Sequence, residues 1–230
     1  MADAKAVART AAKTLLDIEA ILFRPDQPFV FTSGRASPVY VDCRRIISFT
    51  EARNRLMDLA VSLIRETTAD HPPEVIAGGE TAGIPFAAWI AERLELPMIY
   101  VRKKPKGFGR NAQIEGTFHE GARVLLVEDL ATDGGSKINF IEALRTAGAE
   151  VTETLVVFHY GIFPQSTQLL ADRGVRLLGL CTWWDALALV EDSGYLDAGG
   201  VAEVRAFLED PDGWSAAHGG KTSEELAAGG

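Results

Sequence analysis

Cysteine and histidine are scarce in this 230-residue sequence, and neither forms a metal-binding pattern. The two cysteines, Cys43 and Cys181, lie far apart without a Cys-x-x-Cys motif, and the four histidines are scattered. The spacing of a zinc framework is therefore missing. Two reduced, buried thiols in a cytoplasmic protein are predicted, with a disulfide between them as the alternative.

Long apolar runs are also absent. No stretch approaches the roughly 20 apolar residues that span a membrane. The basic residues Lys5, Arg9 and Lys13 are not followed by the apolar core of a signal peptide. Apolar residues recur there at helical spacing instead: Val7, Ala11, Leu15, Ile18 and Leu22. The prediction is an amphipathic N-terminal helix in a soluble, cytoplasmic protein that does not bind membranes.

Positive charge is in the minority. Hydrophobic residues make up 47% and charged residues 24%, the balance of an ordinary globular protein. Lys and Arg number 23 against 32 Asp and Glu, so the net charge is −9. A surface of this sign repels nucleic acid and anionic membranes. Any anionic ligand must therefore be held by a local concentration of positive charge.

Short apolar runs alternate with segments of helical periodicity between residues 50 and 180. The predicted strands cover residues 74–79, 98–102, 123–127, 151–158 and 175–180. The predicted helices cover residues 50–66, 84–94 and 164–172, and another begins near Gly135. Such alternation forms βαβ units, whose strands are parallel. The predicted fold class is therefore α/β, with a mainly parallel sheet flanked by helices.

The most informative segment is residues 124–136, VLLVEDLATDGGS. Here an apolar strand ends in Glu128 and Asp129, and a turn with two glycines leads into a helix. The N–H groups of such a helix start, with the hydroxyls of Thr132 and Ser136, form a phosphate site. Two carboxylates would repel a bare phosphate, so they are predicted to hold ribose hydroxyls or a cationic transition state. The alternative is structural, an acidic strand end that caps the next helix.

This segment resembles the phosphoribosyl pyrophosphate signature of type I phosphoribosyltransferases. The resemblance implies that Glu128 and Asp129 hold the ribose 2′- and 3′-hydroxyls. It also implies that the following loop holds the 5′-phosphate through Thr132, Asp133, Gly134, Gly135 and Ser136. Glu128 stands where the family more often has Asp. Asp133 adds a negative charge to the loop and is expected to point away from the phosphate.

Positive charge is concentrated in residues 100–110, where five cations fall within nine residues. A charge run is usually a solvated face, but a mobile cationic loop is also what a pyrophosphate leaving group requires. The segment resembles the catalytic loop of orotate phosphoribosyltransferases. Arg102, Lys103 and Lys106 match the Arg-Lys-x-x-Lys pattern of that loop. Phe108 replaces the His that follows in the family.

The resemblance assigns functions to this loop. It implies that Lys103, Lys106 and Asp129 are the catalytic residues, and that Arg102 and both lysines bind phosphoribosyl pyrophosphate. It also implies a homodimer with shared active sites, because in this family the loop reaches into the neighbouring subunit.

Residues 31–42, FTSGRASPVYVD, narrow the choice of base. A tight turn between two strands would explain them structurally. They are also similar to the hood of orotate phosphoribosyltransferases, which purine-using relatives lack, and the resemblance implies that Tyr40 and Thr132 contact orotate. Many members have Lys at the position of Thr32. Some have an orotate-binding Arg after the strand ending near Phe158, where this chain has none.

The predicted reaction forms orotidine 5′-monophosphate and pyrophosphate from orotate and phosphoribosyl pyrophosphate, in pyrimidine (UMP) biosynthesis. Residues 79–85 match the family loop whose backbone lines the pyrophosphate. Mg²⁺ is the expected cofactor, held by substrate oxygens and not by protein ligands directly. A purine phosphoribosyltransferase and a non-catalytic regulator that senses phosphoribosyl pyrophosphate are the alternatives. No G-x-G-x-x-G follows a strand, which argues against a dinucleotide-binding oxidoreductase.

The predicted organisation has three parts. An N-terminal helix and hood cover residues 1–48, an α/β core covers 49–192, and a C-terminal helix with a flexible tail covers 193–230. From about Asp210 the chain is rich in Gly, Ala and Ser, which is typical of a loose tail. Residues 219–222, GGKT, approach a phosphate-binding P-loop, but the spacing fails and no strand precedes them.

Overall fold

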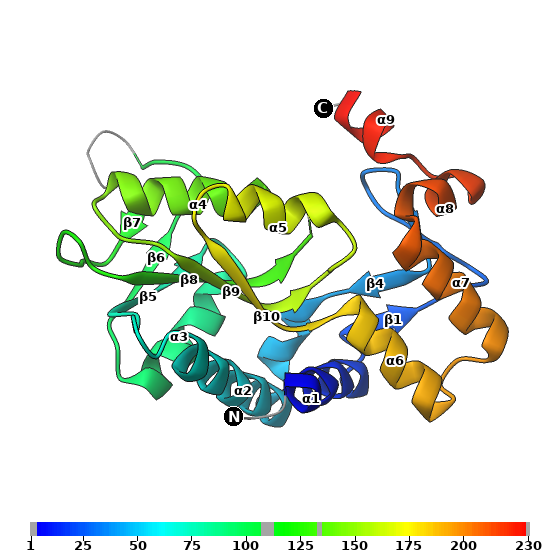
Figure 1. Ribbon diagram of the computed structural model, residues 1–230, viewed down its shortest axis with the longest axis horizontal. Coiled ribbons are helices and arrows are strands. Elements are labelled where there is room, and N and C mark those ends of the chain that lie inside the picture. Colours follow the sequence, from blue (N-terminus) through cyan, green and yellow to red (C-terminus); the bar gives the residue numbers. More distant parts are fainter. Residues whose placement is uncertain (1–3, 107–112, 133–134, 229–230) are drawn as a thin grey trace.

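The fold is built on one large sheet. The computed structural model describes residues 4–106, 113–132 and 135–228 (Figure 1). The six strands are ordered β10-β9-β8-β5-β6-β7. The parallel strands are β5 (Val75–Gly79), β6 (Met98–Val101), β8 (Val124–Ala131), β9 (Glu153–His159) and β10 (Arg176–Thr182), with β7 (Ile114–Glu115) as an antiparallel edge. The predicted α/β class with a mainly parallel sheet is confirmed.

Helices cover both faces of this sheet, as Figure 1 shows. One face carries α4 (Gly135–Thr146) and α5 (Pro164–Ala171), and the other carries α1 (Ala4–Asp17), α2 (Thr50–Thr67) and α3 (Gly83–Leu94). Buried apolar side chains form a separate cluster on each face. The strands are therefore apolar on both sides, as a doubly covered parallel sheet requires. None of the described helices is long and apolar enough to cross a membrane.

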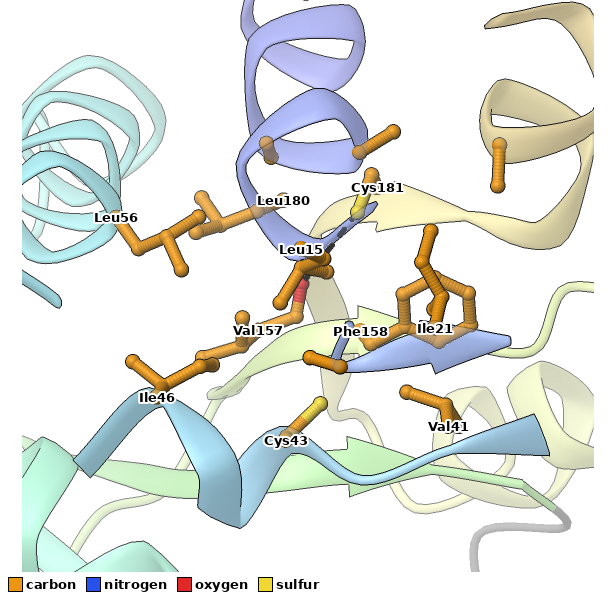
Figure 2. Close-up of a cluster of buried hydrophobic side chains, with 14 of the residues drawn as sticks. Leu15, Ile21, Val41, Cys43, Ile46, Leu56, Val157, Phe158, Leu180 and Cys181 are labelled. Carbon is orange, nitrogen blue, oxygen red and sulfur yellow. Dashed lines mark hydrogen bonds between the residues drawn. The ribbon is translucent and has the colours of Figure 1, made fainter. Parts of the chain in front are cut away.

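The larger cluster joins the sheet to the N-terminal helices (Figure 2). Leu15 of α1 and Leu56 of α2 pack with Val157 of β9 in this cluster. Cys43 and Cys181 are buried there as free thiols, as predicted, and the Cys181 thiol faces the Val157 carbonyl oxygen at 4.0 Å. Burial raises the pKa of both thiols well above their ordinary values. Both cysteines therefore act as small apolar core residues.

The N-terminal helix is shorter than the apolar spacing predicted. It ends at Asp17, because Glu19 takes a left-handed conformation with φ 54°. Leu22 lies instead in strand β1, where it pairs with Tyr40. The other elements of this region are β1 (Ile21–Phe23), β2 (Phe29–Val30), β3 (Ala36–Ser37), β4 (Val39–Val41) and the 3₁₀ helix η1 (Cys43–Ser48).

Strand β8 is longer than predicted, so Glu128 and Asp129 lie inside it and not after its end. The parallel ladder with β9 continues past both acids, with Glu128 opposite Val156 and Ala131 opposite His159. Ladder hydrogen bonds use backbone groups, which every residue but proline offers regardless of its side chain. The apolar pattern alone therefore ended the predicted strand too early.

The C-terminal region departs most from its prediction. It forms α6 (Trp183–Ser193), α7 (Ala198–Glu209), α8 (Pro211–Ala217) and α9 (Ser223–Ala228). Asp197 and Asp210 cap α7 and α8, since their side chains accept backbone N–H groups. Trp214 is buried and its ring stacks on His218 at 3.6 Å. The expectation of a loose tail from about Asp210 was therefore wrong for the described residues, because capped helices anchored by a buried aromatic form there.

Candidate active site

Residues singled out from the sequence gather at the carboxyl ends of the parallel strands, where open α/β sheets bind ligands. Strand β8 carries Glu128 and Asp129, while β6 leads into the basic segment. Adjacent residues of a strand point to opposite faces of the sheet. Glu128 contacts Lys137 of α4, so the adjacent Asp129 points to the opposite face, which carries η1.

Glu128 is buried, with 7% of its surface exposed. Its Oε2 accepts a hydrogen bond from Lys137 Nζ at 2.9 Å. Its Oε1 fills the space beside Gly79, where a Cβ would lie only 2.6 Å away. Burial raises the pKa of Glu128, and the charge of Lys137 opposes that shift without cancelling it. Gly79 and Lys137 therefore fix the place of this carboxylate.

Lys137 is a site residue that the sequence analysis missed. It is 1% exposed, and its Nζ donates to the Leu130 carbonyl oxygen at 2.6 Å as well as to Glu128. A cation in the first turn of a helix is disfavoured by the helix dipole. Lys137 lies in the first turn of α4, and this mismatch is the sequence signal that could have indicated a buried carboxylate partner.

Asp129 faces the base of the hood. Burial raises its pKa above the ordinary value, while backbone hydrogen bonds and the charges of Lys137 and Arg44 oppose the shift. Arg44, in η1, also pairs with Asp42 at 2.8 Å. Burial, followed by the charge of Asp129, raises the pKa of the neighbouring Cys43 thiol. The charge of Lys137 thus acts on both acids, and Asp129 also interacts with Arg44 of η1.

The loop from β5 to α3 lies directly against β8. A Cβ on Gly83 would be 2.3 Å from the Val127 carbonyl oxygen, and one on Gly78 would be 2.8 Å from Ile84 Cα. Real Cβ atoms do not approach so closely, so only glycine allows this packing. The backbone of the 79–85 loop is thereby held beside the two acids. Its contact with pyrophosphate stays a prediction.

The basic segment starts at the end of β6 and is tethered there by carboxylates. The Lys103 backbone N–H donates to Glu80 at 2.7 Å. Arg102 and Lys106 reach Glu115 of β7 at 3.5 and 3.8 Å. The side chains of Lys103 and Lys106 are exposed. The structure therefore places all three predicted cations at the rim of the site, with both lysine side chains exposed to solvent.

Parts of two predicted segments lie outside the described residues. These parts are residues 107–112, which include Phe108, and residues 133–134, which are Asp133 and Gly134. Gly135 and Ser136 are the first residues of α4. The expected orientation of Asp133 and the phosphate contacts of the loop stay predictions.

A cavity of about 760 Å³ adjoins Thr132. Its described lining comes from the hood, the β9–α5 connection and the C-terminal helices: Phe31, Ser33, Arg35, Thr132, Tyr160, Phe163, Gln165, Leu169, Phe207, Ser223 and Leu226. This volume lies in the range of small-molecule and cofactor sites. The structure thus brings the predicted phosphate loop and the predicted hood onto one cavity.

Tyr40, the predicted base contact in the hood, packs against an aromatic residue of the cavity wall. Its ring packs on Phe29 and Phe31 with centroids 5.4 and 6.1 Å apart. It is not among the described residues that line the cavity, whereas Phe31 is. Tyr40 therefore supports a wall of the cavity, and its contact with orotate stays a prediction.

The two acids are poorly arranged to form a metal cage. In the part of the chain that the structure describes, no group of three or more His, Cys, Asp and Glu side chains could hold a metal ion. Glu128 and Asp129 point to opposite faces of β8, so they do not chelate one ion together. A divalent cation here would have to take most of its ligands from a substrate and water. The prediction of such a Mg²⁺ stays a prediction.

Comparison with known proteins defines the class. Residues 49–162 match the family model described as a phosphoribosyl transferase domain. The orotate phosphoribosyltransferase of Cereibacter sphaeroides is 57% identical over 209 residues, which is 90% of each chain. A crystal structure of orotate phosphoribosyltransferase from Aeropyrum pernix is 35% identical with a TM-score of 0.66, and covers 80% of this chain and 98% of that one.

A crystal structure of the Mycobacterium tuberculosis orotate phosphoribosyltransferase in complex with phosphoribosyl pyrophosphate is also similar. It is 27% identical with a TM-score of 0.58, and covers 77% of this chain and 98% of that one. Fold and site together define a phosphoribosyltransferase. Within that class, the chain belongs to the orotate phosphoribosyltransferase family.

Proposed function

We propose that this chain transfers the phosphoribosyl group of phosphoribosyl pyrophosphate to orotate. The observation that carries the proposal is the single cavity shared by Thr132 of the phosphate loop and Ser33 of the hood. In the reaction, orotate N1 bonds to ribose C1′, the C1′–oxygen bond to pyrophosphate breaks, and the N1 proton is released. The products are orotidine 5′-monophosphate and pyrophosphate. Family membership supports both the donor and the base.

Glu128 and Asp129 are proposed to hold the ribose hydroxyls and to stabilise the positive charge that forms at C1′ as the bond breaks. Both carboxylates are buried enough for their pKa values to be raised. Positioned charges act more strongly in such a desolvated site than in water. When bound, Mg²⁺ would neutralise pyrophosphate oxygens. Thr132 and the start of α4 would hold the 5′-phosphate.

Lys103, Lys106 and Arg102 are proposed to neutralise the departing pyrophosphate. Glu115, the present ion-pair partner of Arg102 and Lys106, is a weak competitor, because surface ion pairs contribute little. Glu80 accepts a hydrogen bond from the Lys103 backbone N–H and so tethers the backbone there. Pyrophosphate carries more charge than one carboxylate, so Arg102 and Lys106 are expected to leave Glu115 for the ligand.

The test is a panel of bases with phosphoribosyl pyrophosphate and Mg²⁺, followed by chromatography of the products. Orotate should be converted to orotidine 5′-monophosphate, while adenine, guanine and hypoxanthine should remain. Activity on a purine with none on orotate would contradict the proposal. Binding of phosphoribosyl pyrophosphate without turnover of any base would indicate a sensor instead.

We also propose a homodimer in which the basic loop of one subunit serves the site of its partner. The loop starts at the rim of the site with its lysine side chains in solvent, and its like charges repel one another when it packs on itself. The resemblance of residues 100–110 to the catalytic loop of orotate phosphoribosyltransferases supports the shared arrangement. The oligomeric state is measured by sedimentation before the functional test.

The functional test mixes two inactive variants, Asp129→Asn and Lys103→Ala, under conditions of subunit exchange. If the loop acts across the dimer, a mixed dimer contains one site with both defects and one with neither, so activity returns. If each loop serves its own subunit, every site keeps one defect. A mixture that stays inactive after exchange has been demonstrated would refute the shared site and leave the proposed chemistry intact.

A further inference from the structure

Glu80 is an acid inside the 79–85 loop, the loop expected to lie along the pyrophosphate. It directly follows the last residue of β5 and is half-buried. A carboxylate at this place repels an anionic ligand, because like charges raise the energy of binding. No step of the proposed mechanism uses this side chain. Glu80 therefore needs a role other than contact with the substrate.

The side chain of Glu80 takes the place of a backbone acceptor. Gly79 pairs with Val101 in the parallel ladder of β5 and β6, and the Glu80 N–H donates to the Val101 carbonyl oxygen at 2.9 Å. If the ladder continued by one step, the Lys103 N–H would donate to the Glu80 carbonyl oxygen. It donates instead to Glu80 Oε2, at 2.7 Å. The chain turns toward α3 after Glu80, so the carboxylate extends the ladder where the backbone leaves it.

The opposite side of this strand end is held by Gln113. The Arg102 N–H donates to the Gln113 carbonyl oxygen at 2.7 Å, and the Gln113 side-chain amide donates to the Arg102 carbonyl oxygen at 3.1 Å. Arg102 and Lys103 thus leave β6 between two partners, Gln113 on one side and Glu80 on the other. The backbone of two predicted cations is fixed where the basic segment begins.

The bond from Lys103 to Glu80 belongs to the stronger class of hydrogen bonds. A carboxylate that accepts a backbone N–H forms a charge-assisted bond, which is shorter and stronger than one between neutral groups. The residue before Glu80 contacts the buried acid, since a Cβ on Gly79 would lie 2.6 Å from Glu128 Oε1. Two consecutive residues at the end of β5 therefore connect the acid of the site to the start of its basic segment.

We infer that Glu80 is a positioning residue of the reaction, whose carboxylate holds the Lys103 backbone at the rim of the site through the Lys103 N–H. The inference rests on the proposed function, in which Lys103 neutralises the departing pyrophosphate. Glu80 acts through Lys103 and does not touch the substrate. The tether lies within one subunit, so it applies whether the basic segment serves its own site or that of a partner.

The test separates the hydrogen bond of Glu80 from its charge. Glu80→Ala removes both, whereas Glu80→Gln keeps an acceptor oxygen and removes only the charge. Loss of the bond should lower kcat for orotidine 5′-monophosphate formation about tenfold in Glu80→Ala, and Glu80→Gln should lower it by about threefold or less. KM for orotate should stay the same in both variants, because neither alters the base half of the site.

A second measurement follows the Lys103 backbone without using activity. Trypsin cleaves the folded protein after Lys103 only when the backbone there is released locally, and mass spectrometry measures the rate at this bond. Cleavage should be about tenfold faster in Glu80→Ala than in the unaltered protein. Glu80→Gln should be cleaved at nearly the unaltered rate.

Glu74→Ala is the matched control. Glu74 is also half-buried, and its Oε2 accepts the Arg123 backbone N–H at 3.0 Å. This bond lies before the first residues of β5 and β8, at the end of the sheet away from the site. Glu74→Ala loses the same kind of bond, so kcat and the cleavage rate after Lys103 should both stay unchanged.

An unchanged kcat in Glu80→Ala would overturn the inference, and so would equal losses of kcat in Glu80→Ala and Glu80→Gln, because the charge alone would then matter. If Glu80→Ala does not fold, Glu80→Asp decides. Its carboxylate is one methylene shorter, so kcat should fall and cleavage after Lys103 should accelerate, and normal values of both would contradict the inference. Failure of the unaltered protein to convert orotate would refute the proposed function, while the cleavage rates would still show whether Glu80 holds Lys103.

Discussion

The two halves of the candidate site are built in different ways. The phosphoribosyl half consists of the 79–85 loop and the end of β8 with the start of α4, and each piece is a continuous stretch of chain. The base half combines the hood with the C-terminal helices. There the Ala36 N–H donates to Ser215 Oγ, and Arg35 donates to Ser223, across separations of 179 and 188 residues. One half is encoded locally and the other is assembled from distant segments.

This difference predicts different consequences of mutation. Substitutions in the phosphoribosyl half alter charges and backbone contacts close to the reacting carbon, so they should lower kcat or destabilise the core. Substitutions in the base half alter contacts between the hood and the C-terminal helices, so they should change the affinity for the base more than turnover. The following predictions test this division, from the largest expected effect to the smallest.

Asp129→Asn should lower kcat by about 100- to 1000-fold, because it removes a positioned negative charge beside the developing cation. The fold should survive, since the amide has nearly the shape of the carboxylate. Steady-state kinetics and circular dichroism measure both effects. Asp58→Asn is the control, as Asp58 is an exposed carboxylate paired with Arg93 on the helices away from the site. A near-normal kcat in Asp129→Asn would contradict the proposal that Asp129 holds the ribose hydroxyls.

Lys137→Met should lower the free energy of unfolding by about 3 kcal/mol, because it leaves a buried carboxylate without its partner. The pKa of Glu128 is already raised by burial, and loss of the cation raises it further. Since the ionised form is the active one, activity falls as pH decreases through that pKa. The acid limb of the kcat profile should therefore move to higher pH.

The control for this change is Lys13→Met. Lys13 pairs with Asp17 at 2.7 Å on the exposed face of α1, so neither stability nor the pH profile should change. An acid limb at the same pH in Lys137→Met and in the unaltered protein would show that Glu128 does not govern it.

Gly83→Ala should destabilise the protein by about 2 kcal/mol, since the new Cβ meets the Val127 carbonyl oxygen and the backbone must shift. The shift would displace the loop beside Glu128, so kcat should fall as well. Urea unfolding gives the first quantity. Gly199→Ala is the control, because Gly199 lies in helix α7 with an ordinary contact at 3.5 Å and should be neutral or slightly stabilised.

Ser215→Ala should have the smallest effect, a loss of about 1 kcal/mol in unfolding free energy. The buried Ser215 hydroxyl accepts from the Ala36 N–H at 3.0 Å and donates to the Lys221 carbonyl oxygen at 2.8 Å. Loss of both contacts loosens the hood, so KM for orotate should rise a few-fold while KM for phosphoribosyl pyrophosphate stays the same. Ser62→Ala, on the exposed face of α2, is the control. A rise in KM confined to phosphoribosyl pyrophosphate would contradict the proposed division between the two halves of the site.

Much of the core could be predicted from the sequence because its signals are local. The helix predicted over residues 50–66 is α2, and the strand predicted over 98–102 is β6. Errors occurred where a nonlocal contact decided the outcome. Pairing with β9 extends β8 past Glu128, beyond the predicted end of the strand. Pairing with Tyr40 places Leu22 in strand β1 and not in the predicted helix. Backbone ladders of this kind leave no periodic signal in side chains.

By itself, the sequence determined the βαβ core and the grouping of its acids, glycines and basic segment toward the carboxyl ends of the strands. These features depend on consecutive residues, because turns, helix starts and charge clusters are made by neighbours along the chain. Only the tertiary structure decided that Lys137 holds Glu128 under α4, and that Arg35 is fixed by α8 and α9 on the base cavity. Burial creates these pairings: a charge removed from water needs a partner nearby in space, and that partner's distance along the chain is set by the fold.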